Sequence, residues 1–180
     1  MTDPISSPRY SPAQRRLHWA MFLLVLVAYV AIEFRGEFPR GSLARTAMVQ
    51  SHFWAGLLVL TLVLPRLWLR LTRGAPPITP PLPAWQAWPS HLAHVALYGF
   101  LLAQPLLGLM TAWTDGKALR LPGTDWVLPA LMAPNPTLAH QLEDLHKTLG
   151  SVFYWVIGLH ILAGLYHHFL RRDDTLRRIT

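Results

Sequence analysis

The sequence predicts an all-α integral membrane protein, a four-helix bundle whose successive helices run up, down, up and down. Hydrophobic residues make up 52% of the 180 residues and charged residues only 14%, whereas soluble domains carry about 25% charged residues. The apolar residues collect in four runs, each long enough to cross a hydrocarbon core about 30 Å thick. We therefore expect one membrane domain at residues 13–170, between a polar N-terminal tail at residues 1–12 and a basic cytoplasmic tail at residues 171–180.

The first two spans are predicted at residues 13–34 and 47–69. Residues 35–45, which join them, contain the glycines and the proline that are typical of a turn. Near the end of the second span Pro65 precedes Arg66, a position where a kink and a snorkelling arginine are both tolerated.

A proline-rich connector at residues 75–83 leads to the third span, which we predict at residues 91–113. Its prolines favour an extended chain without internal hydrogen bonds. A longer loop at residues 114–138 contains Trp126 and several prolines, a composition suited to the membrane surface. The fourth span, at residues 138–170, is longer than the hydrocarbon core requires.

The basic residues indicate on which side of the membrane the termini lie, because cytoplasmic segments carry an excess of them. Four spans place both termini on one side. That side carries ten arginines, whereas the other carries six basic residues whose charge nearby acids cancel. We therefore expect both termini in the cytoplasm. The ten are Arg9, Arg15, Arg16, Arg66, Arg70, Arg73, Arg171, Arg172, Arg177 and Arg178.

Four histidines occupy matching depths in the predicted spans. His146 and His160 stand fourteen residues apart, which places both rings on one helix face about 21 Å apart along the axis. The topology puts His18 level with His160 on the cytoplasmic side, and His52 level with His146 on the outer side. Intramembrane polar residues are costly and usually functional. Two imidazoles from different helices are the arrangement that holds a haem iron with no open coordination site, which suits electron transfer.

The amino-acid composition limits which cofactors and partners other than a histidine-held haem the chain could bind. The chain has no cysteine, which excludes thioether-linked haem, thiolate iron–sulfur clusters and disulfides. Zinc is a weaker alternative because the paired histidines lack carboxylate or cysteine ligands to complete a tetrahedron. Nucleic acid is not an expected partner, because the net charge of +7 comes from arginines at the ends of apolar runs. Hydrogen-bonded intramembrane imidazoles without a metal are the plainer alternative to haem ligands.

Small residues lie close to these histidines along the sequence. They are Gly56, Gly150, Gly158 and Gly164. A flat macrocycle lying along a helix requires missing side chains at such positions. Small residues also let helices approach closely in lipid. Close helix packing explains any single one of these glycines as well as a macrocycle does, but it explains the set of four less well.

Two further histidines near the cytoplasmic face have two interpretations. His167 follows His160 by seven residues on the same helix face, and His94 lies near the start of the third span. Both are candidates for contacts to a quinone or a haem edge, and both are equally well explained as interfacial residues. For His91, His140 and His168 the interfacial interpretation is the simpler one. These three are therefore given no role in the predicted site.

Motifs across all four spans resemble the bacterial cytochrome b561 family. A single His-Trp pair is a weak motif, whereas an ordered series across four spans is specific. The resemblance implies two b haems within the bundle of an inner-membrane protein, with His18 and His160 holding the inner iron and His52 and His146 the outer. The motifs are Leu17-His18-Trp19, residues 31–36 and 38–40, the proline-rich connector, His91-Leu92-Ala93-His94, residues 145–149, residues 156–160, His167-His168 and residues 173–176.

The resemblance also implies an activity, that of a superoxide:ubiquinone oxidoreductase or superoxide oxidase. Such a protein takes electrons from superoxide at the periplasmic face and passes them to ubiquinone, so superoxide, ubiquinone and membrane lipid are the expected partners. Four basic residues, Arg35, Arg40, Lys117 and Arg120, are candidates for steering the superoxide anion. Headgroup contacts or solvated loop charges explain each of the four at least as well.

Two other functions are compatible with the same residues. A haem-carrying membrane anchor would relay electrons between quinone and a partner dehydrogenase or hydrogenase, and would co-purify with that soluble partner. A transporter or structural bundle without haem would give a colourless purified protein.

Overall fold

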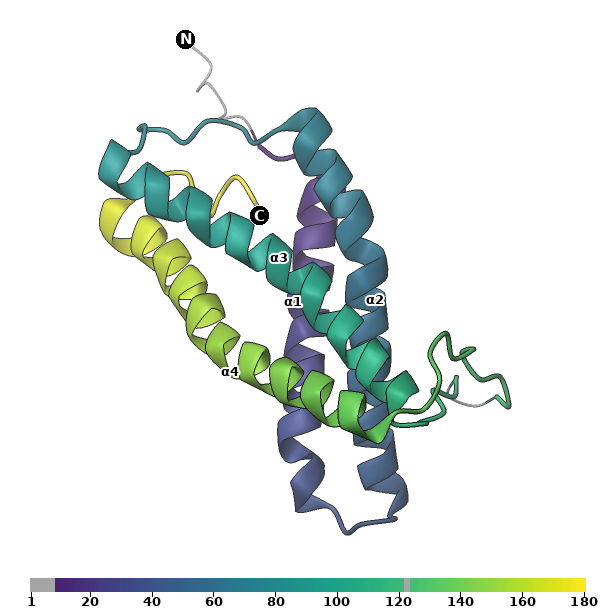
Figure 1. Ribbon diagram of the computed structural model, residues 1–180. Coiled ribbons are helices and arrows are strands. Elements are labelled where there is room, and N and C mark those ends of the chain that lie inside the picture. The colour runs from purple at the N-terminus through teal and green to yellow at the C-terminus, as the bar shows by residue number, and fades with distance from the viewer. Residues whose placement is uncertain (1–8, 122–123) are drawn as a thin grey trace.

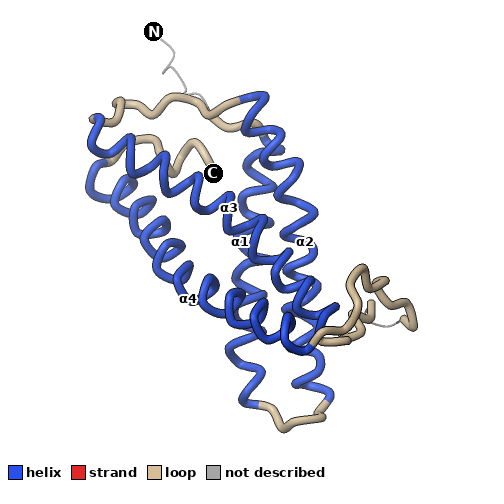
Figure 2. The backbone as a smooth tube through the Cα atoms, in the orientation of Figure 1, coloured by secondary structure: helices blue, strands red, loops and turns tan. Residues whose placement is uncertain are grey.

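The computed structural model describes residues 9–121 and 124–180, and four long helices account for most of them. Successive helices run in opposite directions (Figure 1), and loops join them (Figure 2). The only β-pairing among the described residues is one isolated bridge between Arg120 and Val127. The long helices are α1 (Pro12–Phe34), α2 (Leu43–Arg73), α3 (Ala84–Thr114) and α4 (Pro136–Tyr166), with a 3-10 turn η1 (Arg35–Glu37) and a π-helical segment η2 (His167–Arg171).

All four long helices are long and apolar enough to cross a membrane. Many of their large hydrophobic side chains are exposed, including Leu23, Leu64, Trp155 and Leu162. Together they form an apolar surface far larger than a soluble monomer tolerates. The outer surface of the bundle is therefore the lipid-facing one, and the predicted all-α four-helix membrane fold is confirmed.

Local capping sets the beginnings of the helices. Ser11 and Gln14 form a reciprocal capping box at the start of α1, in which each side chain accepts a hydrogen bond from the other's backbone N–H. Ser42 caps α2, and Asn135 caps α4 immediately before Pro136. α2 and α3 extend at both ends beyond the apolar runs that predicted them.

The helices pack in chain order rather than as a closed ring. α1 lies against α2, α2 against α3 and α3 against α4, whereas in the described residues no Cα of α4 lies within 8 Å of α1 or α2. The core of the first three helices is built on Met21, Val59 and Val63. A space therefore separates α4 from α1 and α2, and side chains span it.

The two ends of the bundle differ. The start of α1, the α2–α3 connector at residues 74–83 and the C-terminal segment at residues 172–180 lie at one end, here called the terminal end (Figure 1). The other end, here called the loop end, carries η1 and the described parts of the loop at residues 115–135. That loop folds back on the bundle, since the indole of Trp54 donates to the carbonyl of Arg120 at 2.8 Å.

Candidate functional site

Two pairs of histidines bridge the space between α4 and the first two helices. At the terminal end, the ring centres of His18 on α1 and His160 on α4 lie 6.5 Å apart, with ring planes inclined by 69°. At the loop end, those of His52 on α2 and His146 on α4 lie 6.0 Å apart, with planes inclined by 86°. Both pairs join the helices whose backbones make no contact.

These separations match what two axial imidazoles of one iron require. A first-row metal ion binds an imidazole nitrogen at about 2.0 Å. Because that nitrogen lies about 1.1 Å from the centre of its ring, two imidazoles on opposite sides of one ion have centres about 6.2 Å apart. The observed 6.0 and 6.5 Å lie on either side of this value. In their spacing the residues present therefore fit a haem that would be held between the two histidines at each level.

Backbone carbonyls orient both histidines of the loop-end pair. The Nδ1 atom of His52 lies 2.8 Å from the carbonyl oxygen of Ala28, and that of His146 lies 3.1 Å from the carbonyl oxygen of Gln104. A carbonyl only accepts, so each Nδ1 carries the proton and each Nε2 keeps a free lone pair. This outer hydrogen bond is the usual companion of a metal-binding imidazole.

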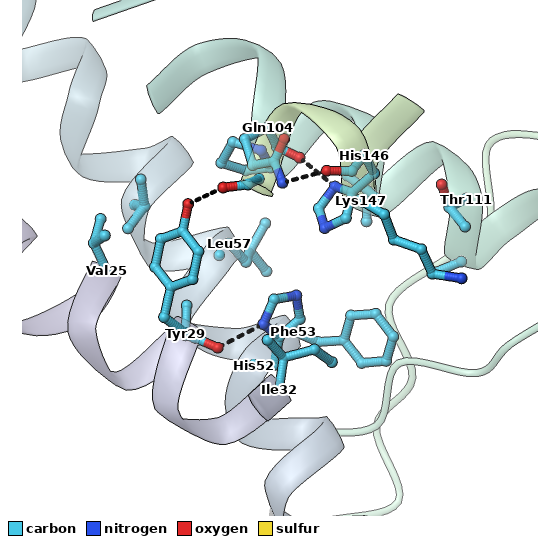
Figure 3. Close-up of a pocket in the computed structure, with 18 of the residues that line it drawn as sticks. Val25, Tyr29, Ile32, His52, Phe53, Leu57, Gln104, Thr111, His146 and Lys147 are labelled. Atoms are coloured by element: carbon cyan, nitrogen blue, oxygen red, sulfur yellow. Dashed lines mark hydrogen bonds between the residues drawn. The ribbon is translucent and has the colours of Figure 1, made fainter. Parts of the chain in front are cut away.

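A cavity of about 540 Å³ lies between the histidines of the loop-end pair and is lined by all four long helices. Figure 3 shows His52 and His146 on its two sides, with Gln104 beside His146 and Tyr29 across the space. Its walls are mostly apolar, as expected for a site that encloses a flat hydrophobic cofactor.

Glycines open part of this space. A Cβ added at Gly56, Gly158 or Gly164 would meet no atom within 4 Å, and Gly56 lines the cavity. Gly150 also lines it and accepts a hydrogen bond from the Tyr29 hydroxyl at 2.9 Å. Of the four glycines singled out in the sequence, Gly56 and Gly150 thus border the cavity, whereas Gly158 and Gly164 do not line it.

Two residues of α3 that the sequence did not single out position His146. A Cβ at Gly108 would lie 3.0 Å from His146 Cε1, so only glycine leaves the ring its present place. The Gln104 side chain donates to the His146 carbonyl at 2.9 Å, and the Gln104 backbone carbonyl accepts from the His146 ring. Neither residue was identifiable beforehand, because both are more than thirty-five residues away from His146 in the chain.

At the terminal end a third imidazole joins the pair. The ring centre of His94 on α3 lies 5.5 Å from that of His160, with planes inclined by 88°. The Nδ1 atom of His94 lies 2.6 Å from the Ser90 carbonyl oxygen. His94 thus lies beside the predicted inner iron site.

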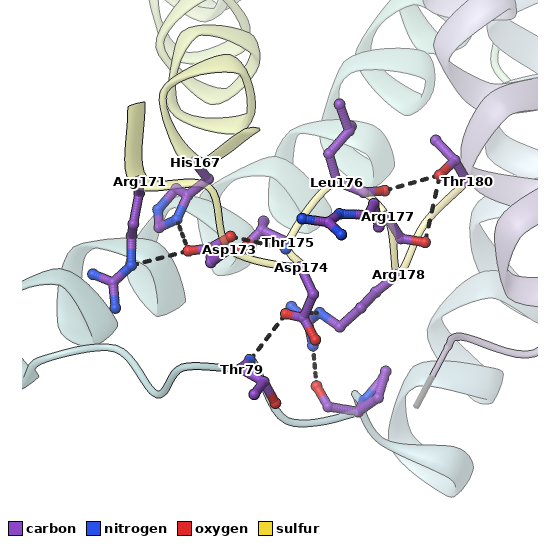
Figure 4. A network of polar contacts seen from close by, with 11 residues as sticks. Thr79, His167, Arg171, Asp173, Asp174, Thr175, Leu176, Arg177, Arg178 and Thr180 are labelled. Carbon is purple, nitrogen blue, oxygen red and sulfur yellow. Dashed lines mark hydrogen bonds and ion pairs between the residues drawn. The ribbon is translucent and has the colours of Figure 1, made fainter. Parts of the chain in front are cut away.

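His167 takes part in a buried polar cluster at the terminal end. Its Nδ1 lies 2.5 Å from Asp173 Oδ2, and Arg171 Nε lies 3.0 Å from the same oxygen. The Asp173 side chain is fully buried, and its other oxygen accepts the Thr175 N–H at 2.9 Å (Figure 4). Burial raises the pKa of the Asp173 carboxyl, but the hydrogen bonds from His167 and Thr175 outweigh it and hold the pKa below the ordinary value.

The predicted basic tail belongs to this cluster and is packed against the bundle. Asp174 accepts the backbone N–H of Thr79 at 2.9 Å, which ties the tail to the α2–α3 connector (Figure 4). Arg178 is buried and donates to the carbonyl of Pro76. On α1, the Trp19 indole donates to the carbonyl of Ile179 at 3.0 Å.

The four candidate steering residues divide into two groups. Arg35 and Lys117 line the loop-end cavity, although Lys117 is paired with Asp115 at 2.6 Å. Arg40 and Arg120 are exposed and do not line it. The structure therefore gathers two of the four at the cavity.

His140 lies outside both histidine pairs, where it pairs with Asp144 at 3.1 Å on the exposed face of α4.

Comparison with known proteins gives one consistent family. The family profile described as Prokaryotic cytochrome b561 matches residues 9–180. The chain is 36% identical over 171 residues to "Cytochrome b561 homolog 1" of Escherichia coli (strain K12), covering 95% of this chain and 96% of that relative. It is 34% identical over 176 residues to "Probable superoxide oxidase CybB" of Yersinia pestis, covering 95% of each. "Cytochrome b561 homolog 2" of Escherichia coli (strain K12) is 32% identical over 127 residues, which cover 68% of this chain and 64% of the relative.

Proposed function

The chain belongs to the prokaryotic cytochrome b561 family, and from this membership we propose that it is a dihaem superoxide:ubiquinone oxidoreductase. The observation that carries the proposal is the presence of two histidine pairs at two levels, each with the ring separation of two axial ligands. The name of the relative from Yersinia pestis, a probable superoxide oxidase, supports the choice of substrate.

In this proposal His52 and His146 hold the outer iron, and His18 and His160 hold the inner one. His94 contacts the edge of the inner haem or the quinone, because its ring centre lies closer to His160 than two ligands of one iron would lie. The terminal end faces the cytoplasm and the loop end the periplasm of a bacterial inner membrane, as the distribution of arginines supports.

Each bound haem supplies a one-electron centre. Two superoxide anions each give up one electron and leave as O₂, and one ubiquinone takes the two electrons and two protons to become ubiquinol. Arg35 and Lys117 at the loop-end cavity attract the superoxide anion. At the terminal end His167, oriented by Asp173, is the candidate group for quinone contact and proton delivery.

The direct test is stopped-flow mixing of the purified, oxidised protein with superoxide, followed at the haem absorbance bands. We expect rapid haem reduction, and reoxidation when ubiquinone is added. Superoxide dismutase added beforehand should abolish the reduction. A protein that contains haem but is not reduced by superoxide, and that co-purifies with a soluble redox subunit, would instead be a membrane anchor that relays electrons to or from quinone.

Gly108→Ala is expected to weaken the outer haem site without unfolding the bundle. The new Cβ would lie 3.0 Å from the His146 ring, and overpacking of this kind costs about 1–3 kcal/mol. We expect at least about fivefold faster loss of the outer haem to an excess of apomyoglobin, since 1.4 kcal/mol is a factor of about ten and about 1 kcal/mol is therefore a factor of about five. Gly99→Ala on the same helix is the control, because a Cβ there meets nothing within 4 Å. Equal rates for the two variants would contradict the assigned role of Gly108.

A further inference from the structure

The terminal end of the bundle gathers positive charge around the inner histidine pair. Arg66 and Arg70 of α2 stand four residues apart, so they share one helix face. Three imidazoles, those of His18, His94 and His160, lie at the same end. Among residues 9–121 and 124–180, no carboxylate forms an ion pair with either arginine.

Both guanidiniums have buried N–H groups that the described residues leave unpaired. Arg66 Nε and Arg70 Nη1 are buried and have no hydrogen-bond partner there. Arg66 lies over the ring of Tyr98 at 5.6 Å from its centre, a contact that attracts the cation but satisfies no N–H group. A buried charged donor without an acceptor is costly, and intramembrane arginines usually serve a function. The side chains of the described residues therefore supply neither guanidinium with a negatively charged acceptor.

The one polar contact of Arg66 conflicts with iron binding at His18. Arg66 Nη2 donates to His18 Nδ1 at 3.0 Å, and because a guanidinium only donates, the imidazole proton is on Nε2. A protonated Nε2 has no lone pair for iron, and Nδ1 is occupied by the arginine. Whichever nitrogen of His18 binds iron, the guanidinium has to leave. At the outer pair the corresponding groups are carbonyls, which leave Nε2 free.

We propose that Arg66 and Arg70 form the binding site for the carboxylate groups of the inner haem. A b haem carries two carboxylates on its edge, and the arginine fork matches a carboxylate with two parallel hydrogen bonds. Binding of the haem gives Arg66 the acceptor it lacks and frees His18 to ligate the iron. The proposal rests on the proposed function, since it requires a haem between His18 and His160.

The pairing of Arg66 and Arg70 with the haem carboxylates also affects the reduction potential of the inner haem. Two cations beside the carboxylates offset negative charge near the inner iron, which favours the reduced form over the oxidised form. The inner reduction potential is therefore higher than it would be without the two arginines, which favours electron transfer towards the inner haem. Arg66 and Arg70 act on the potential through the haem edge and are positioning residues.

The test uses the full-length protein in detergent, with Arg66→Gln and Arg70→Gln compared with wild type. We expect each variant to release the inner haem to apomyoglobin at least ten times faster. We also expect the midpoint potential of the inner haem to fall by about 59 mV. This shift corresponds to a tenfold change in the equilibrium constant of a one-electron reduction. Arg66→Lys keeps the charge but not the fork, so it should recover most of the midpoint and only part of the haem retention. Arg73→Gln is the matched control, because Arg73 is exposed at the end of the same helix.

The outcomes separate this proposal from the proposed function. Wild-type protein with no haem would contradict the proposed function itself. Two haems per chain, with unchanged release and midpoint in both glutamine variants, would overturn the carboxylate site alone. A loss of bound phospholipid in the variants without any change at the haem would also overturn it, because the acceptor would then be a lipid headgroup. If Arg66→Gln does not fold, Arg70→Gln and Arg66→Lys decide the matter by the same readouts.

Discussion

His146→Ala is expected to halve the haem content of the purified protein, from two b haems per chain to one. His146 and His52 face each other with the ring separation of two ligands on one iron, and no other histidine ring is paired with them in the described residues. Loss of one ligand therefore leaves the outer iron without a second axial nitrogen, whereas the inner pair lies elsewhere on α4 and is unaffected. The measurement is a pyridine haemochrome assay together with the visible spectrum of the detergent-solubilised chain.

His160→Ala should remove the inner haem instead, so the two variants must lose haems of different midpoint. His140→Ala provides the control on the same helix, because that ring is exposed and pairs only with Asp144. Wild-type protein with fewer than about two haems, or loss of the same haem in both variants, would overturn the assignment of the pairs.

Asp173→Asn is expected to destabilise the folded protein by about 3 kcal/mol, because it removes the buried carboxylate that pairs with both His167 and Arg171. Breaking one partner of a buried ion pair typically costs about 3–5 kcal/mol, since the other charge stays buried and unpaired. The C-terminal segment would then lose its ion pairs to the end of α4, at His167 and Arg171. The measurement is thermal unfolding in detergent, with limited proteolysis to follow the segment.

The effect should depend on pH in a defined direction. The pKa of Asp173 is lower in the folded protein than its ordinary value of 3.8, so its contribution is complete above that value and is lost as the pH falls through the folded pKa. The difference between wild type and Asp173→Asn should therefore be largest near pH 7 and shrink in strong acid. Asp144→Asn is the control, as an exposed pair contributes only about 0–1 kcal/mol. Equal unfolding of both variants would contradict the role of the cluster.

The four spans were predictable because the property that forms them is local. A run of apolar residues about twenty long identifies a membrane helix whatever it packs against. The pairing of His18 with His160 could also be predicted, because helix geometry and the alternating topology determine the depth of each histidine in the membrane. Depth brings these rings to one level, but it does not say that their centres lie 6.5 Å apart.

The contacts that complete the site were not predictable in the same way. Gly108 and Gln104 lie on α3, which supplies no ligand in the proposed arrangement. No pattern near them in the sequence predicts their contacts with His146. The approach of His94 to His160 depends on the angle at which α3 crosses α4, which side-chain packing along their whole length determines. The tail at residues 171–180 was recognisable as basic, but the sequence does not show that its Asp174 is buried against Thr79 of a distant connector.

The isolation of α4 within the bundle has a consequence for how the protein is made. In the described residues its backbone contacts α3 but neither α1 nor α2, and it leaves the ribosome after the other three long helices. In the proposed arrangement each haem needs one ligand from α4 and one from the first two helices. Neither haem can therefore be held before α4 has been made, and binding of haem is the step that joins α4 to the first two helices.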